Sequence, residues 1–298
     1  MTAVPPELTT LRDFLRWATS RFSAAGLSFG HGTQNAFDEA AWLLLHTLRL
    51  PLDQLELFLD ATLTQEERGT VAAIIDRRIG ERLPAAYLTG EAWLRDFRFR
   101  VDPRVIVPRS HIAGLLLDEA LAPWIGEAEA IASALDLCTG SGCLAIVMAR
   151  AFPMARIDAA DLSADALEVA RENVADYALG ARIELVRSDL FDGLAGRRYD
   201  LIVSNPPYVT GEAMRRLPPE YRHEPAQALA AGEDGLDAVR AILAKARAHL
   251  KPEGLLVVEV GENRGGVEKA FPALPFTWLE AESGEETVFV LQQDQLPG

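Results

Sequence analysis

The sequence predicts an α/β fold in which a mostly parallel sheet carries helices on both faces, preceded by a small helical domain. From residue 111 onward, short apolar runs typical of strands alternate with helical segments, and this alternation is typical of parallel sheets. Residues 7–83 instead carry apolar side chains at helical spacing. We therefore expect a helical domain over 1–85, a β-hairpin linker over 86–110 and an α/β domain over 111–298.

Bulk composition agrees with one large or two modest globular domains. The chain has 298 residues, of which 49% are hydrophobic and 24% charged. No apolar run is long enough to span a membrane, and the first residues lack the basic and apolar regions of a secretion signal. Two cysteines are too few for a disulfide framework. A cytoplasmic protein without membrane attachment is expected.

The net charge is −15, and most of it falls after residue 110. An acidic body repels phosphate backbones, which disfavours stable DNA binding. An acidic enzyme that acts on a basic protein would instead gain electrostatic steering. Solubility alone is the simpler explanation of the same charge.

In the N-terminal domain, apolar side chains recur at helical spacing in two groups: Leu8, Leu11, Leu15 and Ala18, then Trp42, Leu45 and Leu48. Asp38 is expected to start the second helix. Thr64 and Glu67 have the spacing of a capping box, which predicts a third helix through Gly80. This domain has no catalytic motif of its own. It either recognises the substrate or is a purely structural cap.

The linker contains Phe97–Val101, which alternates apolar and polar residues as a half-buried strand does. A turn at Asp102–Arg104 would return the chain as a second strand at Val105–Val107. The basic cluster of the sequence lies here: Arg95, Arg98, Arg100, Arg104 and Arg109. It is either a solvated face or a contact with ribosomal RNA or another partner.

The α/β domain contains seven expected strands: Ala134–Asp136, Arg156–Ala160, Arg182–Arg187, Tyr199–Ser204, Leu255–Val260, Thr277–Ala281 and Thr287–Leu291. Helices are expected between the first five, notably at Ala164–Ala178 and Leu236–Leu250. Only Glu282–Glu286 separates the last two strands, so these should pair antiparallel at the sheet edge.

A glycine-containing turn follows the first strand. Gly140 and Gly142 let a ligand approach the bare backbone, and the helix that follows attracts negative charge at its N-terminus. With Ala145 the spacing also fits a dinucleotide fingerprint. An NAD-dependent oxidoreductase is therefore an alternative, although no hydride-handling residue is apparent.

Acidic residues stand at three successive strand ends, Asp136, Asp161 and Asp189. A carboxylate at Asp161 can accept hydrogen bonds from the hydroxyls of a ribose. Asp189 can accept one from an adenine amine, and Leu190 can pack on the ring. A lone aspartate is more often a helix cap or turn former, but three in this arrangement favour a ligand site.

The most informative stretch is Asn205-Pro206-Pro207-Tyr208, directly after the fourth strand. Two prolines cannot continue a sheet ladder, so the strand ends there. Asn205 brings an amide, the next residues bring fixed carbonyls, and Tyr208 adds an aromatic face. This set can hold a planar group with an NH2, either a carboxamide or a nucleobase amine.

Together these motifs resemble class I methyltransferases, which have a Rossmann-like seven-stranded sheet. Asp136–Gly142 resembles their S-adenosylmethionine loop, and Asn205–Tyr208 resembles the motif of amino-methyltransferases that act on DNA bases or protein glutamine. The resemblance implies S-adenosyl-L-methionine as cofactor and S-adenosyl-L-homocysteine as product. It implies cofactor contacts from Asp136, Cys138, Thr139, Gly140, Ser141, Gly142, Asp161, Leu162, Asp189, Leu190 and Asn205, and no metal.

The helical domain, the hairpin, Pro84-x-x-Tyr87-x-x-Gly90 and the motif from Glu224 to Gly235 resemble only the glutamine branch. These are the protein-(glutamine-N5) methyltransferases, the PrmC/HemK-like family. The resemblance implies a catalytic role for Asn205, Pro206 and Tyr208. It also implies that Asn205, Pro206, Pro207 and Tyr208 bind the substrate amide. We further expect Arg222, His223 and Glu224 to order the loop over the site.

Within this branch the closer resemblance is to the PrmB type, through Leu137–Cys143, Tyr221–Pro225 and Pro275–Glu280. Cys138 stands where release-factor enzymes usually carry glycine. The expected substrate is therefore a glutamine of the basic ribosomal protein L3 (uL3), methylated during ribosome assembly. The alternatives are the Gly-Gly-Gln glutamine of peptide-chain release factors, a nucleic-acid amino group, and a non-catalytic module that keeps the cofactor pocket.

Overall fold

The computed structural model describes residues 5–281 and 284–297. The chain forms two compact units. The first runs up to Ala92 and also includes Leu217–His223, and the second comprises Trp93–Arg216 and the residues from Glu224 onward. Within the described ranges, no helix combines the length and the apolar composition needed to cross a membrane.

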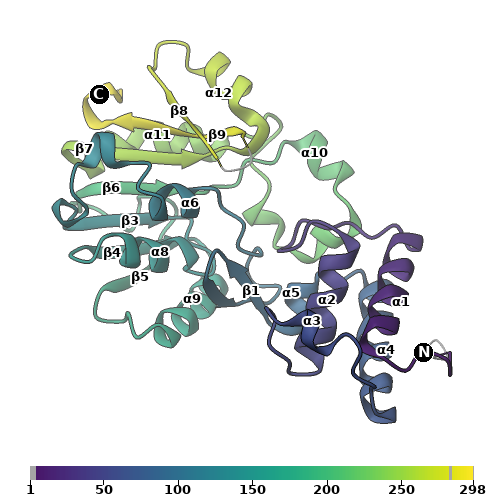
Figure 1. Ribbon diagram of the computed structural model, residues 1–298. Coiled ribbons are helices and arrows are strands. Elements are labelled where there is room, and N and C mark those ends of the chain that lie inside the picture. Colours follow the sequence, from purple (N-terminus) through teal and green to yellow (C-terminus); the bar gives the residue numbers. More distant parts are fainter. Residues whose placement is uncertain (1–4, 282–283, 298) are drawn as a thin grey trace. The chain divides into compact units, whose positions relative to one another are not determined.

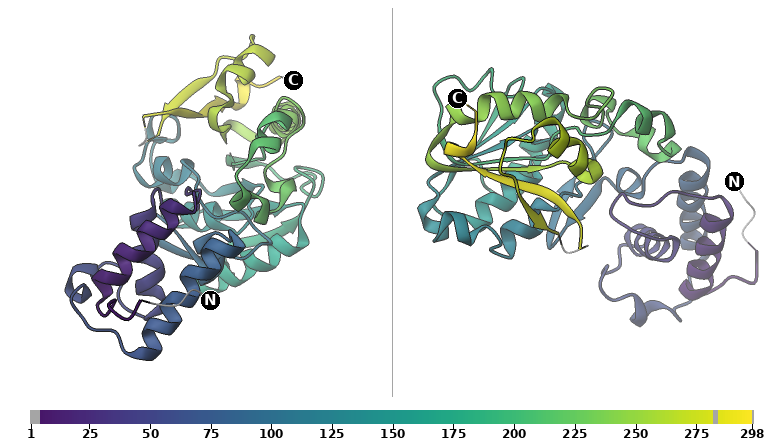
Figure 2. Two further views of the ribbon diagram at one scale, coloured as in Figure 1. Left: turned by 90° about the vertical axis from the view of Figure 1, so that its right-hand side faces the viewer. Right: turned by 90° about the horizontal axis from the view of Figure 1, so that it is seen from above.

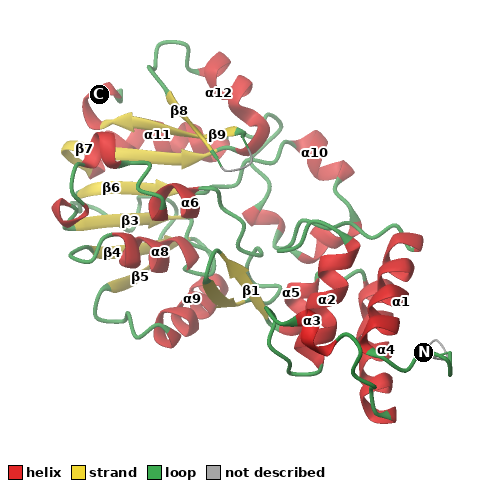
Figure 3. Ribbon diagram, in the orientation of Figure 1, coloured by secondary structure: helices red, strands yellow, loops and turns green. Residues whose placement is uncertain are grey.

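The first unit is helical, as the sequence predicts (Figure 3). Its helices are α1 (Leu11–Ala24), α2 (Ala36–Thr47), α3 (Leu55–Phe58), α4 (Gln65–Glu81) and α5 (Ala85–Thr89). Helices α1, α2 and α4 enclose an apolar core that includes Phe14, Phe22, Leu44 and Ile75, all inaccessible to solvent.

Side-chain caps determine where these helices begin. The capping box predicted at Thr64 is present: its hydroxyl accepts from the Glu67 N–H, and the Glu67 carboxylate accepts from the Thr64 N–H. Such a cap contributes about 1 kcal/mol to helix stability. Helix α2 is capped by Asn35 rather than started by Asp38. The Asn35 side chain accepts from the Asp38 N–H, because a cap precedes the first turn while Asp38 lies within it.

A buried ionic cluster holds the first unit together. Arg78 is completely buried and donates to Glu39 at 2.7 Å, to Glu220 at 3.3 Å and to the carbonyl of Ser28 at 2.9 Å. Arg82 reaches Glu220 as well. Glu39 is 1% exposed and Glu220 is inaccessible, so bulk water does not solvate the negative charge of either carboxylate. Glu220 attaches the late segment Leu217–His223 to helix α4.

The hairpin is present, but the prediction of one of its two strands was wrong. Strand β2 (Phe97–Arg100) matches the predicted strand, and it pairs with β1 (Glu91–Leu94) rather than with Val105–Val107. Arg95, in the left-handed conformation at φ 53°, turns the chain between β1 and β2. Val105–Val107 is not a strand, because the Val107 N–H donates to the carboxylate of Glu224 instead of to a sheet ladder.

Within the described residues, the second unit contains a seven-stranded sheet in the order β5-β4-β3-β6-β7-β9-β8 (Figure 1). The strands are β3 (Ser133–Leu137), β4 (Arg156–Asp161), β5 (Ile183–Arg187), β6 (Tyr199–Ser204), β7 (Leu250–Glu259), β8 (Thr277–Glu280) and β9 (Glu286–Gln292). The first five pair in parallel, whereas β9 is antiparallel to β7 and β8. All seven predicted strands and the antiparallel edge are therefore confirmed. The expected turn from Glu282 to Glu286 falls partly on residues 282–283, outside the described residues.

Helices cover both faces of this sheet (Figure 2). The helices of the second unit are α6 (Ile112–Leu117), α7 (Ala122–Ile125), α8 (Cys143–Ala151), α9 (Ala164–Asp176), α10 (Gly211–Arg216), α11 (Asp237–His249) and α12 (Arg264–Ala270), of which α10 lies away from the sheet (Figure 1). Helices α9 and α11 match the expected helices closely. The alternation of side chains along each strand explains the two layers: Leu135 and Leu137 pack with Val239 and Leu243 of α11, so the residues between them face the opposite layer.

Because Arg78 lies between two buried carboxylates, Arg78→Ala is expected to destabilise the protein by about 3–5 kcal/mol, since in a water-poor interior Glu39 would lose its guanidinium partner and Glu220 would keep only Arg82. The neighbouring Arg77 provides a matched control. It pairs with Glu81 at the surface, where the two side chains are 51% and 48% exposed, so Arg77→Ala should leave the free energy of unfolding nearly unchanged. Urea denaturation of both variants measures the difference. Equal losses would show that burial does not determine the strength of this cluster.

Candidate active site

Parallel pairing brings three predicted site residues into one row. Leu137, the last residue of β3, pairs with Ala160 of β4 on one side and with Ser204 of β6 on the other. The next residue along each chain therefore lies at the same edge of the sheet: Cys138 and Asn205 directly follow β3 and β6, and Asp161 is the last residue of β4. Neighbouring strands are about 4.8 Å apart, so groups at these three ends can act on one ligand.

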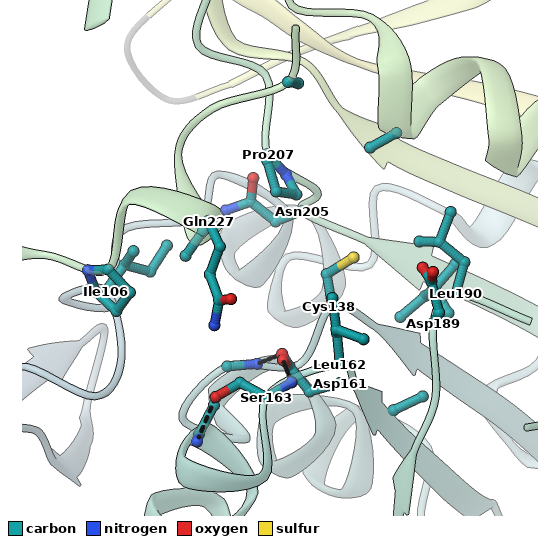
Figure 4. A pocket seen from close by; sticks show the side chains of 18 of the residues that line it. Ile106, Cys138, Asp161, Leu162, Ser163, Asp189, Leu190, Asn205, Pro207 and Gln227 are labelled. Atoms are coloured by element: carbon teal, nitrogen blue, oxygen red, sulfur yellow. Dashed lines mark hydrogen bonds between the residues drawn. The ribbon is translucent and has the colours of Figure 1, made fainter.

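A cavity of about 390 Å³ opens at this edge (Figure 4). Its volume falls within the range of small-molecule sites, roughly 300–1,000 Å³. The predicted site residues that line it are Cys138, Gly140, Asp161, Leu162, Asp189, Leu190, Asn205 and Pro207. The predicted residues outside the lining are Asp136, Thr139, Ser141, Gly142, Pro206 and Tyr208.

The two glycines of the turn have different structural constraints. Gly142 has φ 80°, and a Cβ atom there would lie 3.2 Å from the Cβ of Ala170 in α9, so it allows close packing of two helices. Gly140 has φ 55°, and a Cβ atom there would meet nothing within 4 Å. Since Gly140 lines the cavity, it is the glycine that leaves backbone open toward a ligand.

Asp136 stabilises the glycine turn through hydrogen bonds from inside the domain. Its Oδ2 accepts from the hydroxyl of Thr139 at 2.5 Å and from the N–H of Ala145 at 2.9 Å. The side chain is completely buried, and this burial raises the pKa of Asp136 to about 7. Asp136 thus holds the start of α8 and shapes the turn without facing the cavity.

Two residues of the cavity lining have left-handed backbones although they are not glycine. Cys138 has φ 64° and Leu190 has φ 47°. This conformation costs about 1 kcal/mol or more and is common at functional sites. Burial raises the pKa of the Cys138 thiol, so the group stays protonated and behaves as a small apolar side chain. This geometry gives a reason why glycine suits position 138.

Asp161 holds the turn and still faces the cavity. Its Oδ2 accepts from the N–H of Gly140 at 2.8 Å, and its Oδ1 accepts from the N–H of Ser163 at 2.9 Å. Burial raises the pKa of Asp161. A carboxylate offers about four lone-pair sites, so acceptor capacity remains for a hydroxyl donor of a ligand.

Asn205 lines the cavity and carries an unsatisfied acceptor. Its Oδ1 is buried and has no hydrogen-bond partner among the residues that the structure describes. Buried polar atoms without a partner are rare and call for an explanation. A donor N–H of a bound group is the simplest one, because Asn205 lines the cavity and follows β6 directly (Figure 4).

Tyr208 is fixed by close backbone contacts. A Cβ atom at Gly261 would lie 2.6 Å from Cε2 of the Tyr208 ring, and one at Gly235 would lie 2.4 Å from the Tyr208 carbonyl. Both glycines have positive φ. The tetrapeptide therefore sits against two glycine turns that no larger residue could form without displacing it.

Sequence reasoning missed two further walls of the cavity. One is formed by Arg104, Val105 and Ile106, which were expected to be a turn and a strand. The other comes from Pro225, Gln227, Ala228, Ala230, Ala231 and Gly232, with Asp237, Ala238 and Ala241 of α11. The motif that starts at Glu224 was the available signal for the second wall. Nothing in the local pattern indicated the first.

Residues 13–90 match the PrmC N-terminal domain family, and residues 117–220 match the methyltransferase small domain family. The chain is 59% identical over 292 residues to the ribosomal protein uL3 glutamine methyltransferase of Neisseria meningitidis serogroup B, covering 98% of this chain and 96% of the relative. Identity to the protein of the same name from Bordetella pertussis is 56% over 290 residues, covering 97% of each.

Among solved structures, the catalytic domain of hMettl16 in complex with a MAT2A 3'UTR hairpin aligns with a TM-score of 0.51 and 14% identity. The alignment covers 78% of this chain and 84% of that one. At this identity the likeness concerns the fold alone. It agrees with the Rossmann-like sheet described above.

The residues at the cavity fit S-adenosylmethionine in their chemistry. Asp161 offers acceptors for ribose hydroxyls, Leu162 and Leu190 offer apolar surface for an adenine ring, and Gly140 offers bare backbone. Leu162 is 53% exposed and lines the cavity, so a bound adenine ring could cover it. Asn205, whose Oδ1 has no hydrogen-bond partner among the described residues, lines the same cavity.

The contrast between the two glycines predicts a separation of effects. Gly142→Ala should lower the melting temperature, because the new methyl group would press on Ala170 and the backbone would be strained. Gly140→Ala carries a similar backbone strain but meets open space, so it should weaken S-adenosylhomocysteine binding more than it lowers stability. Calorimetric titration and thermal unfolding of both variants test this. The interpretation fails if Gly142→Ala is the variant with normal stability and lost binding.

Proposed function

Since the chain belongs to the ribosomal protein uL3 glutamine methyltransferase family, we propose that it methylates the side-chain amide nitrogen of a glutamine in ribosomal protein uL3. The identity of 48–59% to curated relatives extends over almost the whole chain. S-adenosylmethionine is the methyl donor. The observation in the structure that best supports amide chemistry is the unsatisfied Oδ1 of Asn205, a residue that lines the cavity.

The chemical difficulty lies in the nucleophile. A carboxamide nitrogen is planar and its lone pair is delocalised, whereas the bound cofactor supplies a methyl group that is electrophilic because it sits on a sulfonium. The task of the protein is therefore to orient the amide and to favour charge that develops on its nitrogen. Orientation of reactants can contribute roughly 7–11 kcal/mol to lowering a barrier.

We assign that task to the tetrapeptide. Oδ1 of Asn205 and the carbonyl of Pro206 accept the two hydrogens of the substrate amide, and Pro207 borders the cavity beside them. Tyr208, fixed against Gly261, limits the rotation of the amide plane. No general base is required, because an N-alkylated amide cation loses its proton readily to water.

The net charge of the chain supports a basic protein as the substrate. Ribosomal proteins bind RNA and are basic, so a chain with a net charge of −15 attracts such a partner. The helical unit, which matches the PrmC N-terminal domain, is proposed to recognise it. A ribosomal substrate also favours a cytoplasmic location.

The arginines of the hairpin region support a solvated face more than a contact with ribosomal RNA. Four of them pair with carboxylates: Arg95 with Asp118, Arg100 with Asp176, Arg104 with Asp102, and Arg109 with Glu224. An arginine neutralised in this way contributes little to binding a phosphate backbone.

Removing the acceptor at position 205 should stop the reaction. Asn205→Ala is expected to lower kcat by about 10³-fold, since oriented dipoles of this kind contribute 10²–10³-fold each and the amide would also lose its orientation. S-adenosylhomocysteine binding should change little. Asn205→Asp is the control, because it keeps an acceptor and should retain more activity than the alanine variant. Near-normal turnover of Asn205→Ala would contradict the proposed mechanism.

The substrate can be tested directly. Purified protein is incubated with labelled S-adenosylmethionine and either ribosomal protein uL3 or a peptide-chain release factor, each from cells that lack the methylation. Mass spectrometry should place one methyl group on a glutamine of uL3. Label on the Gly-Gly-Gln glutamine of the release factor would favour the second candidate, and label on neither protein would overturn the proposal.

A further inference from the structure

Two loops that wall the cavity are joined by a single buried carboxylate. Glu224 is 4% exposed, and its Oε1 accepts from the N–H of Val107 at 2.9 Å. Its two oxygens also accept from the two terminal nitrogens of Arg109, at 2.6 and 2.7 Å. Arg109 in turn donates to the carbonyl of Val107 at 3.2 Å. Paired bonds of this kind between arginine and carboxylate are among the strongest and most directional in proteins.

Each side of this contact continues directly into the cavity wall. The residues before Val107, from Arg104 to Ile106, line the cavity on one side. The residue after Glu224, Pro225, begins the second wall, which continues to Gly232. The contact therefore fixes the distance between two loops that are far apart in the sequence.

The second wall is also bonded to the tetrapeptide segment. The N–H of Val209 donates to the carbonyl of Leu229 at 2.8 Å, and the N–H of Ala231 donates to the carbonyl of Val209 at 3.1 Å. Val209 directly follows Tyr208. A shift of the 225–232 loop would consequently move the residue next to the proposed amide-binding motif.

We propose that Arg109 and Glu224 are a positioning pair for the methyl transfer. They act as a latch that holds the 104–107 and 225–232 loops at the spacing needed for cofactor and substrate amide, and neither is assigned a contact with the reacting atoms. The inference rests on the proposed function for its kinetic part only. Its structural part, the order of the two loops, is measurable on the protein without cofactor or substrate.

The first test is hydrogen–deuterium exchange of the protein alone. Glu224→Gln keeps the size of the side chain and one acceptor for Val107, but it removes the charge and turns an NH2 group toward Arg109. Exchange in peptides that cover residues 104–107 and 226–231 should accelerate by tenfold or more. Exchange in β4 and β6 should stay unchanged.

The second test separates binding from turnover. Glu224→Gln should weaken S-adenosylhomocysteine binding by about tenfold and lower kcat/KM by more than that, because both loops and the neighbouring Val209 are released. Arg109→Lys keeps the charge and loses the paired geometry, so it should show a smaller version of both effects. The double variant should be no worse than Glu224→Gln, since the two residues act through one contact.

Arg100→Lys is the matched control. Arg100 also donates two bonds to one carboxylate, that of Asp176, but its side chain is 52% exposed and it does not line the cavity. This variant should change neither exchange nor binding.

Unchanged exchange of the 226–231 peptides in Glu224→Gln would overturn the proposal, as would fully additive losses in the double variant. Normal loop exchange with slow turnover would show that Glu224 acts on the reaction in another way. If uL3 were not methylated by the unaltered protein, the proposed function would fail while the exchange and binding results still decided whether the latch exists.

Discussion

In-register parallel pairing between β3, β4 and β6 is the constraint on which the candidate site depends. Backbone hydrogen bonds set Leu137 beside Ala160 and Ser204, so the three chains leave the sheet together. The hydroxyl of Ser204 donates to the carbonyl of Leu137 at 2.7 Å and adds a side-chain bond to this row. The chemistry offered to a ligand then depends on the residue that stands next along each chain: Cys138 after β3, Asp161 at the end of β4 and Asn205 after β6.

Buried polar side chains keep this edge in shape where the regular ladder ends. Asn173 of α9 is 1% exposed, and its amide group donates to the carbonyls of Ser141 and Arg100 and accepts from the Arg100 N–H. One side chain thus ties the glycine turn to the hairpin. Asp136 does the same for the start of α8. Among the described residues the amide of Asn173 has both its oxygen and its nitrogen bonded, and a satisfied buried group of this kind rigidifies a site.

The sequence was informative wherever a signal is local. Strand patterns, the Thr64 capping box, the glycine turn and the Asn205 tetrapeptide can all be recognised from neighbouring residues. The sequence was uninformative where hydrogen bonds between residues far apart in the chain determine the local structure. Val105–Val107 has the composition of a strand but bonds to Glu224, and the left-handed backbone of Cys138 follows from the turn around it. One of the two carboxylate partners of Arg78, Glu220, lies 142 positions away, so no local pattern could place the segment 217–223 in the helical unit.

That segment makes the helical unit discontinuous along the chain. The residues of the helical unit lie on both sides of the stretch 93–216, which belongs to the second unit. The carboxylate of Glu220 is therefore encoded far from Arg78 and Arg82, which neutralise it. A gene fragment ending near residue 92 would therefore encode Arg78 without one of its two counter-ions. In the same way, recombination between relatives could exchange the helical unit intact only if residues 217–223 were inherited with it. Natural variation at Glu220, Arg78 and Arg82 should consequently be coupled.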